Sequence, residues 1–416
     1  MDSFSYTQQQ LHAENLPVGE LAQRYGTPLY IYSRQAIETQ FQAYLDGLGK
    51  HPGLICFAVK ANSNIGVLSC LAKQGAGFDI VSVGELERVI AAGGEPSKVV
   101  FSGVAKKAFE MRRALEVGIH CFNVESAAEL ERLNDVAGEM GKVAPISLRV
   151  NPDVDAKTHP YISTGLKENK FGVDYRLAKA FYQRAAQMGN VKIIGMDCHI
   201  GSQLLEPQPF ADALERLLSL IAELKAEGIV LQHIDMGGGI GVKYEAADQE
   251  PDVASYIADL VAHLEGTGLS LVLEPGRSIV ANAGIMVTEV EYLKDNGEHH
   301  FAIVDAGMND LIRPSLYQAW MDIVPVDAAS QGKNAQWDIV GPVCESTCFL
   351  GKGRNLNIAQ GDLLAVKSAG AYSFVMASNY NTRTRPAELM VDGDKVTVVR
   401  QRESLADLWA GESTID

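Results

Sequence analysis

The stretch Leu54–Asn64 reads LICFAVKANSN, a nearly unbroken apolar run that one lysine closes before small and polar residues. An apolar run this short is typical of a strand buried on both faces, as in a parallel sheet. Lys60 then lies at the carboxyl end of the strand, beside low-dielectric packing. Partial desolvation there would favour the neutral amine, which can form a Schiff base with a carbonyl. The alternative is a lysine that only marks where a strand surfaces, and this stretch alone favours that alternative.

Similar apolar runs alternate with segments of helical spacing from about residue 30 to residue 277. The predicted strands are Leu54–Lys60, Phe78–Ser82, Val99–Gly103, His120–Val124, Ile146–Asn151, Ile193–Ile200, Leu231–Gly237 and Leu269–Glu274. Helical spacing is clear in Val83–Ala92, Ala127–Ala137 and Phe210–Ala226. Eight strands alternating with helices predict an α/β fold of the parallel (β/α)8 TIM-barrel type. An open doubly wound sheet is the alternative, and it is weaker because no GxGxxG opens the first helix.

The pattern changes after Arg277, where helical periods largely disappear. β-like runs occupy Phe301–Asp305, Trp337–Val343 and Asp362–Ser368, and Ala387–Val399 has the pattern of a hairpin that turns at Asp392-Gly393. We therefore expect a barrel over residues 31–276 and a second, mostly β domain over residues 277–416. Residues 1–30, which lead into PLYIYS, are expected to add a strand to the β domain.

Composition limits the classes of function. The chain has 416 residues, 47% of them hydrophobic, and a net charge of −16 from 36 basic and 52 acidic residues. This balance, with no block of five basic residues, argues against nucleic acid and anionic membranes as partners. The polar N-terminus MDSFSYTQQQ and the lack of an 18-residue apolar stretch argue against a signal peptide and a membrane span. We expect a cytoplasmic protein with a small-molecule substrate.

The six cysteines form no CxxC pair, and Cys344 and Cys348 have no matching pair or histidine cluster elsewhere in the sequence. This spacing argues against a zinc site, so no metal is predicted.

Residues at the carboxyl ends of barrel strands face one mouth, where active sites lie. These strand ends carry Lys60, Asp79, Ser102, Asn123, Arg149, His199, Gly237–Gly239 and Glu274. The loop Met236–Gly241, MGGGIG, lets backbone N–H groups approach a phosphate, with help from the N-terminus of a following helix. A tight turn is the alternative, but three consecutive glycines exceed what a turn requires.

Two further strand ends admit a ligand or a structural role. His199, in DCHIGSQ, can stack on a planar ring while Ser202 donates to a phosphate, although a lone histidine is more often a hydrogen-bonded core residue. Glu274, in LVLEPGR, is a carboxylate after apolar residues and needs a cationic partner, either Arg277 or a protonated ring nitrogen of a ligand. A lysine, a phosphate loop, a flat ring and an acid together describe a site for pyridoxal 5'-phosphate (PLP).

The motifs FAVKAN, CHIGSQ, MGGGIG, EPGR, GPVCES (341–346) and SAGAY (368–372) resemble the fold-type III PLP decarboxylases, which have an alanine racemase-like barrel plus a β domain. Within that group HPYISTGLKENKFG (159–172), RPSLY (313–317) and CES resemble the diaminopimelate decarboxylases. The resemblance implies a carboxy-lyase that converts meso-2,6-diaminopimelate to L-lysine and CO2, the final step of lysine biosynthesis.

The resemblance also implies roles for individual residues. Lys60 would carry the cofactor, His199 would stack on its ring and Glu274 would keep its pyridine nitrogen protonated. The full set expected to bind the cofactor is Lys60, Asp79, Arg149, His199, Ser202, Gly238, Gly239, Glu274, Gly276, Arg277 and Tyr372. The set expected to bind the substrate is Arg277, Arg313, Tyr317, Glu345 and Tyr372.

Cys344 matches the proton donor of the family, so Lys60, His199 and Cys344 form the expected catalytic set. Cys344 and Glu345 would reach in from a partner subunit, which implies a homodimer with shared active sites. The chain departs from the family after CES, where Thr347-Cys348 replaces the usual Gly-Asp. The conformation of this loop is therefore left open.

Three alternatives remain. A decarboxylase of ornithine, arginine or lysine has no need of a second carboxylate site, so Arg313 favours diaminopimelate. A racemase of similar build would place an arginine, not Glu274, at the pyridine nitrogen. A non-catalytic PLP carrier of this type would lack the β domain.

Overall fold

The computed structural model describes residues 3–152, 170–245 and 247–415. Most of the motif at 159–172 therefore lies outside the described residues. The chain forms two compact units: one comprises residues 40–242 and 249–278, and the other comprises residues 1–39, 243–248 and 279–416. The domain limits expected from the sequence, 31–276 for the barrel and 1–30 with 277–416 for the β domain, stay a prediction.

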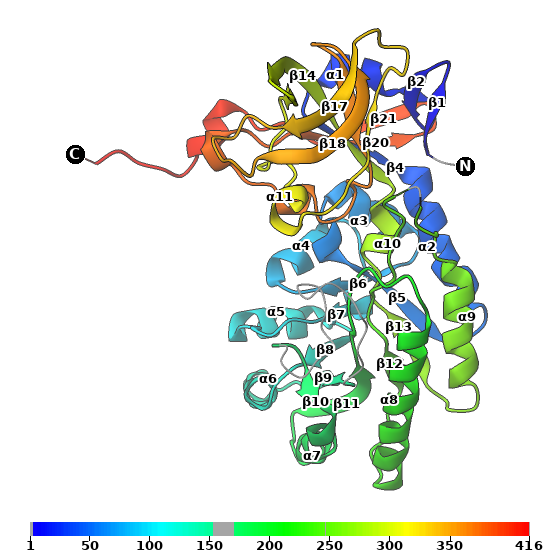
Figure 1. Cartoon of the computed structure of the whole chain (residues 1–416). Helices are drawn as coiled ribbons and strands as arrows, with labels where there is room; N and C mark the ends of the chain where they lie inside the picture. The colour runs from blue at the N-terminus through cyan, green and yellow to red at the C-terminus, as the bar shows by residue number, and fades with distance from the viewer. Residues whose placement is uncertain (1–2, 153–169, 246, 416) are drawn as a thin grey trace. The chain divides into compact units, whose positions relative to one another are not determined.

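The first unit contains a closed barrel of eight parallel strands, which confirms the predicted (β/α)8 fold (Figure 1). The strands follow one another around the barrel in the order β5-β6-β7-β8-β9-β11-β12-β13, and β13 pairs with β5 to close it. Their bounds are β5 Gly53–Ala58, β6 Gly77–Ile80, β7 Val99–Phe101, β8 Cys121–Val124, β9 Ala144–Asn151, β11 Val191–Asp197, β12 His233–Asp235 and β13 Ser270–Leu273. The short β10, Val173–Asp174, adds to β9.

Burial explains why the strands have nearly continuous apolar sequences. Every residue of β6, β7, β8 and β12 is buried, as expected where helices cover one face of a strand and the barrel interior covers the other. A hydrophobic cluster joins residues of five strands: Leu54 and Cys56 of β5, Val100 of β7, Cys121 of β8, Ile194 of β11 and Val272 of β13. Each large apolar side chain buried in this way contributes about 1.5–3 kcal/mol to stability.

Helices alternate with the barrel strands along the chain. They are α2 Arg34–Leu48, α3 Ile65–Lys73, α4 Val83–Ala91, α5 Ala108–Val117, α6 Ala127–Glu139, α7 Tyr175–Ala185, α8 Gln208–Ala226, α9 Val253–Leu264 and α10 Arg277–Val280. Short 3-10 turns occupy Val59–Ala61 and Pro96–Lys98. Ser82 and Ser126 fix the starts of α4 and α6, because each hydroxyl accepts a backbone N–H three residues on, at 3.2 Å. Strand-to-helix connections are thereby short and well defined at this end of the barrel.

The second unit is mostly β, as predicted. Its main sheet has the order β18-β17-β15-β14-β4-β20-β21, with β19 paired to β14 and β16 paired to β19, and β1–β3 form a small separate sheet. The strands are β1 Phe4–Thr7, β2 Gln10–Ala13, β3 Leu16–Pro17, β4 Leu29–Ser33, β14 Gly284–Asn296, β15 His299–Val304, β16 Ile323–Pro325, β17 Lys333–Val340, β18 Phe349–Ile358, β19 Leu363–Val366, β20 Ala387–Asp392 and β21 Lys395–Arg400. The helices are α1 Val18–Tyr25 and α11 Arg313–Tyr317, with 3-10 turns at Phe374–Met376, Tyr380–Thr382 and Leu405–Trp409.

Two predictions about this unit are confirmed in detail. The strand from PLYIYS, β4, lies inside the sheet, antiparallel to β14 and parallel to β20. The hairpin β20–β21 turns where Asp392-Gly393 was expected, and Gly393 has a φ of +60°, a conformation that glycine adopts without strain. Among the helices of the described residues, none combines the length and the apolar character needed to cross a bilayer.

Candidate active site

Lys60 follows β5 in the 3-10 turn Val59–Ala61, so the strand ends two residues earlier than predicted. Its Nζ donates to Oδ2 of Asp79 at 2.6 Å. Asp79 is fully buried on β6, whereas 40% of the Lys60 side chain is exposed. The expectation of a neutral, desolvated amine is therefore wrong for the described state. The adjacent carboxylate favours the charged ammonium, and water reaches the side chain.

Glu274 follows β13 and is buried within a group of carboxylates. Its Oε1 accepts hydrogen bonds from Asn123 Nδ2 at 3.1 Å and from Ser102 Oγ at 3.4 Å. Oxygen atoms of Asp197, Asp235 and Glu274 all lie within 4.8 Å of one another. Burial, followed by the charges of Asp235, Asp79 and Asp197, raises the pKa of Glu274 well above its usual value, while Lys60 lowers it.

The same causes act on the two aspartates. Burial raises the pKa of Asp235 to about 6. Burial and the charge of Asp235 raise the pKa of Asp197 well above its usual range. A ligand with a protonated nitrogen, placed beside these carboxylates, would therefore stabilise their ionised form.

Arg149 lies on β9 beside this group. Its guanidinium is 3.9 Å from Asp197 and 3.7 Å from Glu125, and it lies 4.9 Å from the ring centroid of Phe171. Burial alone would lower the pKa of Arg149, but the carboxylates outweigh burial and raise it. Glu125 in turn accepts backbone N–H groups of Gly103 and Gly172. Arg149 is thus a fixed positive charge at the mouth.

The glycine loop Gly237–Gly239 follows β12 and has no room for side chains. A Cβ at Gly238 would lie 2.2 Å from the carbonyl oxygen of Glu274, and one at Gly239 would lie 2.5 Å from that of Gly201. Gly239 also has a φ of +108°. The glycines therefore let three strand-end segments meet.

The N-terminus of the following helix was expected to add positive potential at this loop, but that helix, α9, begins only at Val253. The chain instead forms a parallel bridge between Leu204 and Ile240. A phosphate at this loop would be held by backbone N–H groups and side chains, without a helix N-terminus behind the loop.

His199 lies beside the glycine loop, just after β11. Its Nδ1 accepts the N–H of Gly238 at 3.3 Å. Burial of the ring, with the charges of Arg149 and Lys60, lowers its pKa well below the usual value, so the imidazole is neutral near pH 7. Ser202 accepts a hydrogen bond from Nη2 of Arg277 at 3.2 Å. Gly276 packs against the turn that carries Lys60, since a Cβ there would lie 2.9 Å from Cβ of Ala61.

The other expected residues belong to the β unit. Arg313 opens α11, is 7% exposed, and lies 5.2 Å from the ring centroid of Tyr244. Tyr317 ends the same helix and is 37% exposed. Tyr372 is half-buried with a φ of +53°, a strained conformation for a tyrosine.

The loop with Cys344 and Glu345 is also in this unit. Cys344 is exposed, and its backbone N–H donates to Oδ1 of Asn381 at 2.7 Å. Glu345 accepts a hydrogen bond from the hydroxyl of Tyr380 at 3.3 Å. Cys348 is buried, and its sulfur accepts the N–H of Met308 at 3.3 Å. The replacement of the usual Gly-Asp by Thr347-Cys348 thus puts a buried side chain at position 348. The side chain of Cys344 remains exposed.

Sequence reasoning overlooked Glu125, Asp197 and Asp235, which lie at or just after the ends of β8, β11 and β12. Each follows apolar residues in the same way as Glu274, and this signal was available. An aspartate at a strand end is also typical of a turn, and only barrel closure brings these carboxylates together.

Comparisons with known proteins agree with this geometry. Residues 34–281 match the family model described as the pyridoxal binding domain of pyridoxal-dependent decarboxylases. The chain is 60% identical to the diaminopimelate decarboxylase of Pseudomonas aeruginosa, over the whole of both chains. It is similar to the crystal structure of diaminopimelate decarboxylase from Helicobacter pylori complexed with L-lysine, with a TM-score of 0.90, 43% identity, and coverage of 94% of this chain and 98% of that chain. The corresponding M. jannaschii structure has a TM-score of 0.94 and 35% identity and covers 100% of this chain and 98% of that one.

Proposed function

Because this chain belongs to the diaminopimelate decarboxylases, we propose that the residues of its barrel mouth serve the release of CO2 from meso-2,6-diaminopimelate to give L-lysine. The observation that carries this proposal is the buried carboxylate Glu274, set among acids beside the ion pair of Lys60 and Asp79. The solved Helicobacter pylori relative, which is complexed with L-lysine, supports the same product here.

The residues at the mouth fit pyridoxal 5'-phosphate. Lys60 would hold the cofactor through its amine, and its 40% exposed side chain leaves that amine within reach. The glycines of Gly237–Gly239, where no Cβ fits, with Ser202 and Arg277, would hold the phosphate. When bound, the cofactor supplies an electron sink for the electron pair left as the carboxylate departs as CO2.

Glu274 would hold a proton at the pyridine nitrogen. A buried carboxylate with a raised pKa is costly to ionise alone, and an N–H⁺ group beside it offsets that cost. Asn123 and Ser102 fix its Oε1 through their hydrogen bonds. Two further residues would set the charge around the cofactor. Asp79 accepts a hydrogen bond from Lys60, and the positive charge of Arg149 lies near the carboxylates of Asp197 and Glu125.

His199 would lie against the cofactor ring as a neutral imidazole, because its lowered pKa removes a positive charge that a pyridinium would repel. The hydrogen bond from Gly238 to Nδ1 leaves the proton on Nε2 and fixes the tautomer. A neutral, oriented ring provides stacking without competing for the proton held by Glu274.

The β unit would supply groups for the substrate and the proton. Arg313 with Arg277 would bind the distal carboxylate, which offers a bidentate match to a guanidinium, and Tyr317 and Tyr372 would line the site. Glu345 would pair with the distal ammonium. The thiol of Cys344 would give its proton to the former α-carbon, and its exposure keeps it available for that role.

We infer that the active unit is a homodimer in which Cys344 and Glu345 of one copy serve the barrel of the other. The family resemblance carries this inference, and the exposure of both residues on the β unit is consistent with it. The cytoplasm is the proposed location, and the six free cysteines support it, since a reducing compartment keeps thiols unpaired.

CO2 release from labelled substrates tests the proposed function. With PLP present, meso-diaminopimelate is expected to release CO2 at a specificity constant at least about a thousandfold above those of ornithine, arginine and lysine. The reason is that a site built for a buried charged group rejects a ligand that leaves it unpaired. Faster release from ornithine or arginine would assign the chain to another basic amino acid. Racemisation without CO2 release would make it a racemase.

A further inference from the structure

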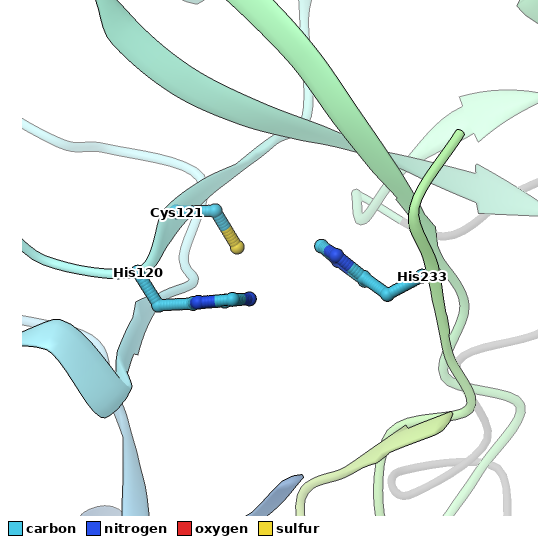
Figure 2. A group of neighbouring side chains, drawn as sticks. All are labelled: His120, Cys121 and His233. Atoms are coloured by element: carbon cyan, nitrogen blue, oxygen red, sulfur yellow. The ribbon is translucent and has the colours of Figure 1, made fainter. Parts of the chain in front are cut away.

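A second group of ionisable side chains lies at the amino-terminal ends of the barrel strands, opposite the mouth. Cys121 is the first residue of β8, His120 precedes it, and His233 is the first residue of β12. Figure 2 shows that the three side chains point toward one another. A ring nitrogen of each histidine and the sulfur of Cys121 all lie within 4.8 Å of one another.

Each of the two imidazoles has a buried nitrogen atom without a hydrogen-bond partner among the described residues. His233 is 2% exposed, and Nε2 of both His233 and His120 has no hydrogen-bond partner within the described part of the chain. The centroids of the two rings are 5.3 Å apart. Buried polar atoms without partners cost about 1–3 kcal/mol each. Each imidazole therefore has a nitrogen whose hydrogen-bonding capacity is unused within the described residues.

The position of His233 is fixed by packing. A Cβ at Gly195 of β11 would lie 2.0 Å from Nε2 of His233, so the imidazole occupies the space of a side chain that glycine lacks. A rigid ligand loses little conformational entropy on binding. His120 is only partly buried, which gives solvent access to one member of the group.

The thiol of Cys121 is the third member of the group. Its sulfur makes a long contact to Oδ1 of Asn123 at 3.8 Å, which is a weak hydrogen bond.

We propose that His120, Cys121 and His233 bind one transition-metal ion of the Zn²⁺ type at the amino-terminal end of the barrel. Two imidazole nitrogens and one thiolate are a ligand set that zinc accepts, with water as the fourth ligand. Binding forms two metal–nitrogen bonds and one metal–sulfur bond and releases the thiol proton to solvent. Metal–ligand bonds of about 2.0–2.3 Å need the three ligand atoms to move together by about 1 Å or less.

The ion would have a structural role. β8 and β12 are not neighbours, since β9 and β11 lie between them in the barrel order. A bound ion would connect them through the interior, at the barrel end where residues serve stability. The sequence prediction of no metal rested on the absence of CxxC spacing, and this group has adjacent ligands plus one from a distant strand.

Cobalt is the probe for this site, because tetrahedral Co²⁺ with a thiolate ligand has visible ligand-field bands and a charge-transfer band at shorter wavelength. We expect the reduced, PLP-loaded protein to take up one equivalent of Co²⁺ with both features, and Zn²⁺ to displace it. Zn²⁺ is also expected to raise the melting temperature, since an ion that binds only the folded state stabilises it.

Matched variants separate this site from others. Replacing the partly exposed His120, in His120→Ala, should weaken Co²⁺ binding by at least about tenfold, the loss seen even for second-shell changes. Cys121→Ala should abolish the thiolate charge-transfer band. Cys344→Ser, which removes the exposed thiol of the β unit, should change neither result.

Three outcomes would overturn the proposal. The first is that the wild-type protein takes up no cobalt. The second is that uptake is lost in Cys344→Ser but kept in His120→Ala. The third is that cobalt binds without a thiolate band, which would indicate binding at the carboxylates of the mouth.

Discussion

At the scale of the residue, Glu85 shows how the acids of the barrel mouth affect stability. It lies in the first turn of α4 and accepts the backbone N–H of Val81 at 2.7 Å. Burial, with the charge of Asp79, raises its pKa from 4.5 to about 7, although Val81, Lys60 and Arg88 act in the opposite direction. Its carboxyl therefore binds a proton more tightly in the folded chain than in the unfolded one.

This shift predicts a pH-dependent effect of Glu85→Gln. The pKa of Glu85 is 4.5 in the unfolded chain and about 7 in the folded one, so folding takes up a proton between these pH values. The free energy of unfolding therefore falls as the pH rises from about 4.5 to about 7 and stays low above that. Glutamine removes that loss while it keeps an acceptor for Val81. We expect the variant to be more stable by about 2 kcal/mol at pH 8 and unchanged at pH 4, since one pKa unit corresponds to about 1.4 kcal/mol and solvent screens part of the effect.

Urea unfolding at the two pH values measures this difference. Glu215→Gln, on the exposed face of α8, is the matched control and should show no gain at either pH. A gain for Glu85→Gln of equal size at pH 4 and pH 8 would mean that ionisation is not its cause.

Sequence reasoning was strongest where the residue type carries the chemistry. Lys60, His199 and Glu274 were expected at strand ends on one barrel mouth, and the structure places them there. The prediction that the Lys60 amine is neutral was wrong. Its charge depends on the ion pair with Asp79, which joins two strands and follows from their register. Local sequence gives the burial of a strand but not the charge that faces its last residue.

At the scale of the element, the eight strands and their helices could be predicted, because apolar runs and helical spacing are local. The structure shortens some strands, as at β12, where only His233–Asp235 of the expected Leu231–Gly237 is paired. The segment after the glycine loop could not be predicted. It pairs through Leu204 and Ile240, whose contact arises only when two strand-end loops meet.

At the scale of the whole molecule, the proposed dimer predicts complementation between inactive chains. Lys60→Ala removes the cofactor lysine and Cys344→Ala removes the proton donor, and each variant alone should lose at least about a hundredfold in turnover. Mixed subunits that exchange should recover up to about a quarter of the wild-type activity per chain, because half of the chains enter hybrids and each hybrid has one intact site.

Activity of the mixture against meso-diaminopimelate measures this recovery. Glu215→Gln mixed with Lys60→Ala is the matched control. It should keep about half of the wild-type activity per chain, because every Glu215→Gln barrel keeps Lys60 and either partner supplies Cys344. No recovery in the first mixture, under conditions where labelled chains are seen to exchange, would contradict a shared active site.

The central claim is that the barrel mouth holds pyridoxal phosphate through Lys60. Lys106 is the natural comparison, because its side chain is buried, unlike that of Lys60, and its ammonium already donates to Gly103, Asn123 and Glu129 at 2.7–2.8 Å. Three acceptors use its full donor capacity, which marks a structural lysine.

Borohydride reduction of the PLP-loaded protein, followed by peptide mass spectrometry, tests the claim most directly. We predict one reduced cofactor per chain on the peptide that contains Lys60, and none on the peptide that contains Lys106. A cofactor fixed to Lys106 or to another lysine, or a colourless protein with no adduct, would contradict it.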